Sequence, residues 1–155
     1  WDLAMGDTPV TQRAYEKALR KNMYFLNFAP IVFVSSQSGL NVRKAIDVID
    51  QVAAQTTATV PTSTLNKVLH DATRRVQPPQ VHGKRLKFYY ATQVGERPPR
   101  LRLYVNDPER CTTTYRQFLV GQLRAALGLE GAPLVLEFRS SHEGREPRYG
   151  KRDKT

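Results

Sequence analysis

Cations and tyrosines alternate with apolar residues between positions 84 and 106, and this stretch has the composition of a surface that binds a polyanion. Lysine and arginine bind phosphate groups, and tyrosine rings between them can stack on unpaired bases. Three runs, 85–91, 100–105 and 134–139, alternate with a period of two, which is typical of strands with one buried and one exposed face. The sequence therefore predicts a sheet with an open cationic face.

The alternation assigns side chains to the two faces of this sheet. The residues predicted to face the core are Leu86, Phe88, Tyr90, Leu101, Leu103, Val105, Leu134, Leu136 and Phe138. The residues predicted to face outward are Arg85, Lys87, Tyr89, Arg100, Arg102, Tyr104, Val135, Glu137 and Arg139. The outward set holds five cations and two tyrosines, so it is a candidate RNA-binding face. A solvated polar face and a surface docked on another domain are the alternatives.

Cations outside the sheet form two further groups. One group lies on the outer side of a helix predicted from about residue 62 to 76, beside the basic segment 82–85. The other lies in the tail 140–155, where apolar residues vanish and which we expect to be a mobile basic arm. The RNA-binding candidates in these groups are Lys67, Arg74, Arg75, Lys84, Arg145 and Arg148.

The net charge of +10 is concentrated in the second part of the chain. Residues 1–60 hold six Lys or Arg and five Asp or Glu, whereas residues 61–155 hold eighteen and nine. This asymmetry indicates an anionic partner, either nucleic acid or a membrane surface, with charge for solubility as the alternative. The longest apolar run, 29–34, is far shorter than the roughly 20 residues of a membrane span, so no membrane insertion is expected.

Catalytic and metal-binding patterns are weak. The histidines have no metal-ligand spacing, and the single cysteine, Cys111, has no sequence-adjacent base, so neither a metal site nor a catalytic residue is predicted. One cysteine fits a reducing compartment, and no signal peptide opens the chain, so a cytoplasmic location is expected. The absence of an initiator methionine leads us to expect a part of a longer protein.

Residues 1–60 have the pattern of the end of a doubly wound α/β domain. Thr8 and Pro9 predict a helix start, with the helix running to about Asn22. The apolar run 31–34 predicts a strand covered on both faces, and Asn41 is expected to cap a second helix. Ligands of such domains bind at the carboxyl ends of strands, which is where the serine-rich loop 35–39 lies.

Residues 61–139 predict an α+β domain of order α-β-β-α-β, with both helices on the apolar side of a three-stranded sheet. The Thr- and Ala-rich stretch 55–60 before Pro61 marks the domain boundary. The second helix is expected to start after Thr112–Thr114 and to end at Gly128.

Short motifs spread along the chain resemble the C-terminal part of the bacterial ribosome-assembly GTPases of the Der (EngA) family, which carry two GTPase domains followed by a KH-like domain. The resemblance covers residues 1 to about 152 and implies the remnant of a P-loop GTPase domain joined to a KH-like domain. The matching elements are Trp1-Asp2, Phe28-Ala29-Pro30, the segment 32–39, Gln77-Pro78-Pro79, Gly83-Lys84-Arg85, Tyr90-Ala91, Pro98-Pro99, Tyr115-Arg116 and Gly131-Ala132-Pro133.

The resemblance implies a guanine-binding role for three residues. Asp2 ends the N-K-W-D motif and is expected to accept hydrogen bonds from the ring N–H and exocyclic amino group of guanine. Ser35 and Ser36 match the loop whose backbone N–H groups contact the guanine oxygen, with Ser36 in place of the usual alanine. From the sequence alone, Asp2 is a terminal residue and the serine loop a strand-to-helix turn.

The 155 residues contain no G-x-x-x-x-G-K-[ST] motif, so we expect no GTP hydrolysis and no cofactor for this chain by itself. In the intact protein the family implies GTP or GDP with Mg²⁺. It also implies ribosomal RNA, the large ribosomal subunit and the GTPase domains of the same protein as partners. The string 128–131 matches the GXXG clamp of KH domains but is predicted to join a helix to a strand, so it is not expected to hold RNA. The rival to RNA docking is a module that only docks on the GTPase domains.

Overall fold

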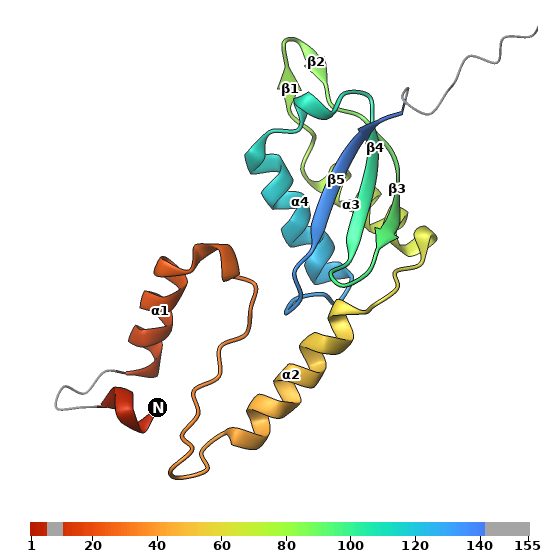
Figure 1. The fold of residues 1–155 in the computed structure, drawn as a ribbon. Helices are drawn as coiled ribbons and strands as arrows, with labels where there is room; N and C mark the ends of the chain where they lie inside the picture. The colour runs from red at the N-terminus through yellow and green to blue at the C-terminus, as the bar shows by residue number, and fades with distance from the viewer. Residues whose placement is uncertain (6–10, 142–155) are drawn as a thin grey trace, which may run out of the picture.

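The computed structural model describes residues 1–5 and 11–141 of the chain (Figure 1). The first part consists of two short 3₁₀-helices, two α-helices and the segments that join them. These elements are η1 (Asp2–Met5), α1 (Gln12–Asn22), η2 (Tyr24–Leu26) and α2 (Val42–Thr56). The second part is α3 (Thr62–Arg75), β1 (Gln80–Val81), β2 (Lys84–Arg85), β3 (Phe88–Gly95), β4 (Arg100–Val105), η3 (Pro108–Arg110), α4 (Thr113–Ala126) and β5 (Val135–Ser140).

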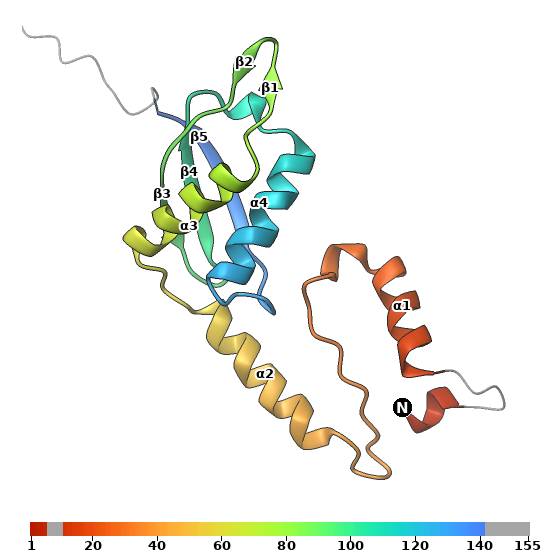
Figure 2. The ribbon, with the colours of Figure 1, turned by 180° about the vertical axis from the view of Figure 1, so that it is seen from behind.

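The main sheet has three strands in the order β3-β4-β5. Strand β3 pairs antiparallel with β4, and β5 pairs parallel with β4 after the crossover through α4. Helices α3 and α4 lie on the same face of this sheet and leave its other face open (Figures 1 and 2). The predicted α-β-β-α-β order and the one-sided covering are therefore confirmed.

The hydrophobic core lies between this sheet and the two helices that cover it. Apolar residues at helical spacing point inward from both helices, such as Leu65 and Leu69 of α3 and Leu119 and Leu123 of α4. Burial of each such leucine contributes about 1.5–3 kcal/mol relative to leaving it exposed. The largest fully buried side chains are Leu65, Leu86, Leu101, Leu103, Leu119, Leu123, Leu129, Val105 and Pro99.

Helix ends in this part follow the predicted chemistry. Thr112 caps α4, because its Oγ1 accepts a hydrogen bond from the Tyr115 N–H at 3.3 Å. Gly128 follows the helix with a φ of 67°, a conformation that glycine adopts without strain. The Tyr115 phenol donates to the Val76 carbonyl at 2.9 Å and so ties α4 to the end of α3. Burial raises the pKa of Tyr115 to about 12, so this phenol stays protonated at neutral pH.

The first part of the chain differs from the prediction in one element. The run 31–34 forms no hydrogen-bonded ladder with any strand among the described residues. The prediction of a strand at this position is therefore wrong. An isolated run has no partner for its backbone groups, and apolar composition cannot replace that partner. Its Phe33 packs instead on Trp1, with ring centroids 4.7 Å apart. Helix α2 accordingly leaves Ile46 and Ile49 exposed.

The start of α1 falls partly outside the described residues. Thr8 and Pro9 belong to the segment that the structure does not describe, and the described helix begins at Gln12. Thr11 is its N-cap, with Oγ1 accepting a hydrogen bond from the Ala14 N–H at 3.2 Å. Asn41 precedes α2 but does not cap it with its side chain; its amide donates to the Phe33 carbonyl at 3.0 Å.

The first sheet strand begins later than predicted. Lys84 and Arg85 pair with Gln80 and Val81 in a separate two-stranded hairpin, and β3 starts only at Phe88. His82 and Gly83, both with positive φ, form the turn of this hairpin, a backbone combination that suits tight hairpins. Arg85 and Lys87 therefore do not belong to the open sheet face.

A bulge in β3 reverses the predicted direction of one tyrosine. Phe88 pairs with Val105, but the next registered pair is Tyr90 with Tyr104, so one extra residue, Tyr89, lies between them. From this point the alternation shifts by one residue. Ala91 is fully buried, whereas Tyr90 is 48% exposed beside Tyr104. The prediction that Tyr90 faces the core is wrong.

No helix in the described ranges 1–5 and 11–141 is long and apolar enough to cross a membrane. The same ranges contain no cluster of three or more His, Cys, Asp or Glu residues that could hold a metal ion.

Candidate nucleic-acid interface

The open sheet face is built from three cross-strand rows. Strand register places Tyr90, Tyr104 and Arg139 in one row, and Thr92, Arg102 and Glu137 in the next. A third row contains Gly95, Arg100 and Val135. Their buried neighbours Leu101, Leu103 and Val105 point to the helices, as the period-two pattern of β4 predicted. The face therefore presents three arginines, two tyrosines and one glutamate.

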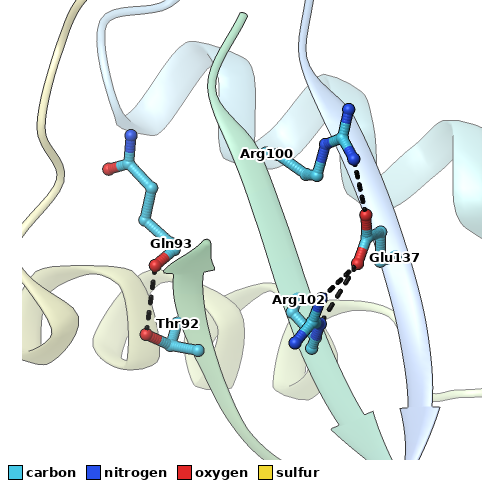
Figure 3. Close-up of polar contacts among 5 residues, drawn as sticks. All are labelled: Thr92, Gln93, Arg100, Arg102 and Glu137. Atoms are coloured by element: carbon cyan, nitrogen blue, oxygen red, sulfur yellow. Dashed lines mark hydrogen bonds and ion pairs between the residues drawn. The ribbon is translucent and has the colours of Figure 1, made fainter. Parts of the chain in front are cut away.

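Glu137 holds two of these arginines (Figure 3). Its Oε1 accepts from Arg100 Nη1 at 3.2 Å, and its Oε2 accepts from Arg102 Nη2 and Nε at 3.0 and 3.1 Å. Hydrogen bonding from Arg102 is the main cause that lowers the pKa of Glu137, and the same bond raises the pKa of Arg102. The carboxylate is ionised at neutral pH and cancels part of the arginine charge. The face is thus less cationic than the five predicted cations implied.

The two tyrosines of the first row form a stacked pair. The ring centroids of Tyr90 and Tyr104 are 4.2 Å apart, and the ring planes differ by 17°. Burial, and next the neighbouring Tyr104, raise the pKa of Tyr90, so its phenol is neutral at physiological pH. A hydrogen bond with Tyr104 also contributes to the raised pKa of Arg102, which links the stacked pair to the arginine–glutamate cluster.

The cations of the hairpin segment lie at one end of the sheet (Figure 1). Lys84, Arg85 and Lys87 are all exposed. The Arg85 guanidinium donates to Gln77 Oε1 at 3.3 Å. Asn106 fixes the backbone here, since its side chain accepts from the Lys87 N–H at 2.8 Å and donates to the Arg85 carbonyl at 3.0 Å.

The predicted cations of helix α3 occupy a different surface. Lys67, Arg74 and Arg75 are exposed on α3, which covers the face of the sheet opposite to the tyrosines. Arg75 Nη1 donates to Gln122 Oε1 of α4 at 3.2 Å. Arg145 and Arg148 lie outside the described residues. Two separate cationic surfaces therefore exist in the described part of the chain.

The residues assigned to guanine lie close together although they are more than thirty positions apart. The Trp1 backbone nitrogen donates to the Val34 carbonyl, and a hydrogen bond from Ser35 is the main cause that lowers the pKa of Asp2. Ser35 is only 3% exposed, and its Oγ accepts from the Ser38 N–H at 3.3 Å. Ser36 follows on the surface. The carboxylate and the loop thus share one location.

The loop 128–131 is engaged within the chain. The Gly131 N–H donates to Gln55 Oε1 of α2 at 2.8 Å, and a Cβ at this glycine would lie 2.8 Å from Val52 Cγ2. Arg124 of α4 stacks over Phe28 with its Cζ 4.2 Å from the ring centroid. The loop joins α4 to β5, as predicted, and packs on α2 instead of presenting an open GXXG clamp.

Two features of this interface are not predicted by sequence reasoning. The pairing of Glu137 with Arg100 and Arg102 depends on the parallel register of β4 and β5, although the outward position of Glu137 was visible in the alternation. The stacked pair depends on the bulge at Tyr89, for which the sequence carries no glycine or other marker.

Comparisons with known proteins identify similar sequences over most of the chain. A family model described as the KH-domain-like region of EngA bacterial GTPase enzymes, C-terminal, matches residues 59–139. The chain is 43% identical over 138 residues to GTPase Der of Natranaerobius thermophilus and 41% identical over 139 residues to GTPase Der of Desulforudis audaxviator. These alignments cover 88% and 90% of this chain. The chain spans 31% and 32% of the length of these two relatives.

Proposed function

Because this chain belongs to the EngA family of bacterial GTPases, whose C-terminal KH-domain-like region it contains, we propose that it docks a ribosome-assembly GTPase on the ribosomal RNA of the large subunit. In this proposal residues 1–60 are the C-terminal portion of a GTPase domain and residues 61–139 are the KH-like domain. The remaining residues, 140–155, are a basic tail that adds cations for RNA.

The observation that carries the proposal is the set of exposed cations on α3 and the hairpin. Lys67 and Arg74 of α3 and Lys84 of the hairpin are exposed and form no ion pair with an acid within residues 1–5 and 11–141. Cations without acidic partners can release counterions from a nucleic acid, and this gain is large in sum and independent of base sequence. Arg100 and Arg102 are less available to phosphate groups, since Glu137 already binds both.

Salt dependence tests this proposal. Binding of the 155-residue chain to a ribosomal RNA fragment is measured between about 50 and about 200 mM salt, where a phosphate-binding surface loses affinity steeply. Lys67→Ala and Arg74→Ala are each expected to lower the slope of log affinity against log salt by about 1. Glu109→Gln, which removes an exposed acid of η3, serves as the charge control. No detectable binding in dilute buffer, or slopes unchanged by both lysine and arginine variants, contradicts the proposal.

The guanine contacts are a second element of the proposed function. In the intact protein, GTP or GDP with Mg²⁺ binds mainly to upstream sequence, and Asp2 accepts the two guanine hydrogen bonds while the backbone of Ser35 and Ser36 contacts the guanine oxygen. The shared location of Asp2 and the Ser35 loop supports this assignment. This chain has no phosphate-binding loop motif, so a fluorescent GTP titration is expected to show no tight binding. Tight binding would show that the chain holds phosphates by another route.

Docking on the GTPase domains is the second candidate function. It is favoured by the contacts that already tie the KH-like region to the preceding segment, namely Gly131 with Gln55 and Arg124 with Phe28. Those contacts leave the tyrosine pair and the α3 cations uncovered. This candidate would be favoured if the chain binds separately prepared GTPase domains and does not bind RNA. The binding of the GTPase domains would then be insensitive to salt and to Lys67→Ala.

A further inference from the structure

The stacked tyrosines of the open sheet face present an aromatic surface to solvent. Strand β3 is an edge of the three-stranded sheet, so no further strand formed by residues 1–5 or 11–141 lies beyond Tyr90. One side of Tyr90 stacks on Tyr104 at 4.2 Å, and 48% of the residue remains exposed. Packing of a cross-strand aromatic pair stabilises a sheet, but this alone does not require an exposed ring.

The charge around this pair is positive but sparse. Arg100 and Arg102 are occupied by Glu137 in the neighbouring rows, whereas Arg139 is exposed and registered directly opposite Tyr104. Among the described residues of this face, one available guanidinium beside a stack of two tyrosine rings differs from a phosphate-tracking groove, which needs several cations in line. It has the composition of a site for one base and one adjoining phosphate.

We propose that the exposed face of Tyr90 in the Tyr90–Tyr104 stack binds one unpaired base of single-stranded RNA, with Arg139 binding an adjacent phosphate. This inference rests on the proposed RNA-docking function. It adds to that function a specific base-binding site and the requirement that the bound RNA is single-stranded. A base inside a duplex has both of its faces covered by neighbours, so only an unpaired base can extend the stack. Every base offers a π-face, so recognition at this site tolerates different sequences.

The test uses the 155-residue chain and an unstructured RNA of about 12 nucleotides with 2-aminopurine at a central position, compared with a blunt duplex of similar length. Binding quenches 2-aminopurine fluorescence if the base stacks on a ring. Tyr90→Ala is expected to weaken binding of the single strand roughly 5- to 150-fold, the range expected for loss of one base–aromatic stack, and to remove the quenching. The salt slope is expected to stay unchanged in this variant, because no phosphate contact is lost.

Matched variants separate stacking from folding. Tyr90→Phe keeps the ring and is expected to bind within about twofold of the parent chain, given that stacking needs the π-face and not the hydroxyl. Tyr24→Ala removes another exposed tyrosine, on η2, and is expected to leave RNA binding unchanged. Arg139→Ala is expected to lower the salt slope by about 1 while quenching persists. Circular dichroism of each variant verifies that the sheet is intact.

The outcomes distinguish this inference from the function on which it rests. If folded Tyr90→Ala keeps the affinity for the single strand and the fluorescence quenching of the parent chain, the stacking site is overturned. The proposed RNA docking still stands in that case if Lys67→Ala lowers the salt slope. Tighter binding of the duplex than of the single strand also overturns it. Absence of any RNA binding by the parent chain overturns both. Loss of binding in Tyr90→Phe shows that the hydroxyl, and not the stack, is the recognition group, which contradicts the inference as well.

Discussion

At the scale of single residues, Glu137 controls the character of the open sheet face. One carboxylate binds two guanidinium groups. It lies in the middle row of the face, between the row that contains Tyr104 and the row that contains Arg100. Its 24% side-chain exposure leaves the cluster in contact with water, so the pairing is screened by salt. The residue thereby sets how many arginines of this face are available to phosphate.

Replacement of Glu137 is expected to change stability in a pH-dependent way. Its pKa is lowered in the folded protein, so the stabilisation by the arginine pair is present above the ordinary pKa of 4.5 and is lost as pH falls through the lowered folded-state value. Glu137→Gln is therefore expected to melt below the parent chain at about pH 7, with a smaller deficit at about pH 3. Thermal unfolding followed by circular dichroism at both pH values measures this. An equal deficit at both pH values would mean that packing, and not charge, is lost.

At the scale of elements, two side-chain amides hold the β3 strand to the segments beside it. Asn66 of α3 pairs with both backbone groups of Ala91, donating to its carbonyl at 2.9 Å and accepting from its N–H at 2.8 Å. Gln93 accepts from the Val60 N–H at 2.7 Å and donates to the Ala58 carbonyl at 3.0 Å. The Asn66 amide thus takes the place of a neighbouring strand at Ala91 and protects this part of the β3 edge from pairing with another chain, whereas the Gln93 amide fastens the segment 58–60 to β3.

Removal of the Asn66 amide is expected to destabilise the KH-like fold. Asn66→Ala leaves the buried Ala91 N–H and carbonyl without these partners, and each unsatisfied buried group costs about 1–3 kcal/mol. Ser63→Ala, an exposed change on the same helix, is expected to alter the free energy of unfolding by less than about 0.5 kcal/mol. Urea denaturation of both variants provides the comparison. Equal stability of Asn66→Ala and the parent chain would refute the role of the amide as an edge clamp.

At the scale of the whole molecule, the chain divides into a well-packed KH-like part and a preceding segment with few buried residues. The two parts meet where the loop 128–131 contacts α2. The core extends from Val60 to Leu136, and neither α1 nor α2 contains a fully buried residue. Gly131 is central to the contact because α2 approaches its backbone too closely for a side chain.

A methyl group at Gly131 is expected to weaken the contact with α2. A Cβ there lies 2.8 Å from Val52 Cγ2, so Gly131→Ala forces a shift that costs about 1–3 kcal/mol. Gly121→Ala, in α4 where nothing lies within 4 Å of the new Cβ, is expected to stabilise the helix by about 0.5–1 kcal/mol. Hydrogen exchange of the α2 amides measures the local effect. Unchanged exchange in Gly131→Ala would show that the two parts do not depend on this approach.

The local sequence pattern determined the order of elements in the KH-like region, the inward faces of β4 and β5, and the exposed positions of the cations on α3. Those features follow from periodicity, caps and turns, which depend on residues close in the chain. The resemblance of short motifs also identified the family correctly. The lack of a ladder at 31–34 was not predictable in this way, because a strand exists only with a partner.

Only the tertiary structure decided how the open sheet face works. The bulge at Tyr89 brings Tyr90 onto Tyr104, and the parallel register of β4 and β5 places Glu137 between Arg100 and Arg102. Both depend on strands that meet from distant positions, and a shift of one residue in such a pairing sends a side chain to the opposite face. Composition alone therefore predicted a cationic sheet, whereas the register of its strands made it an aromatic surface with most of its arginine charge already paired.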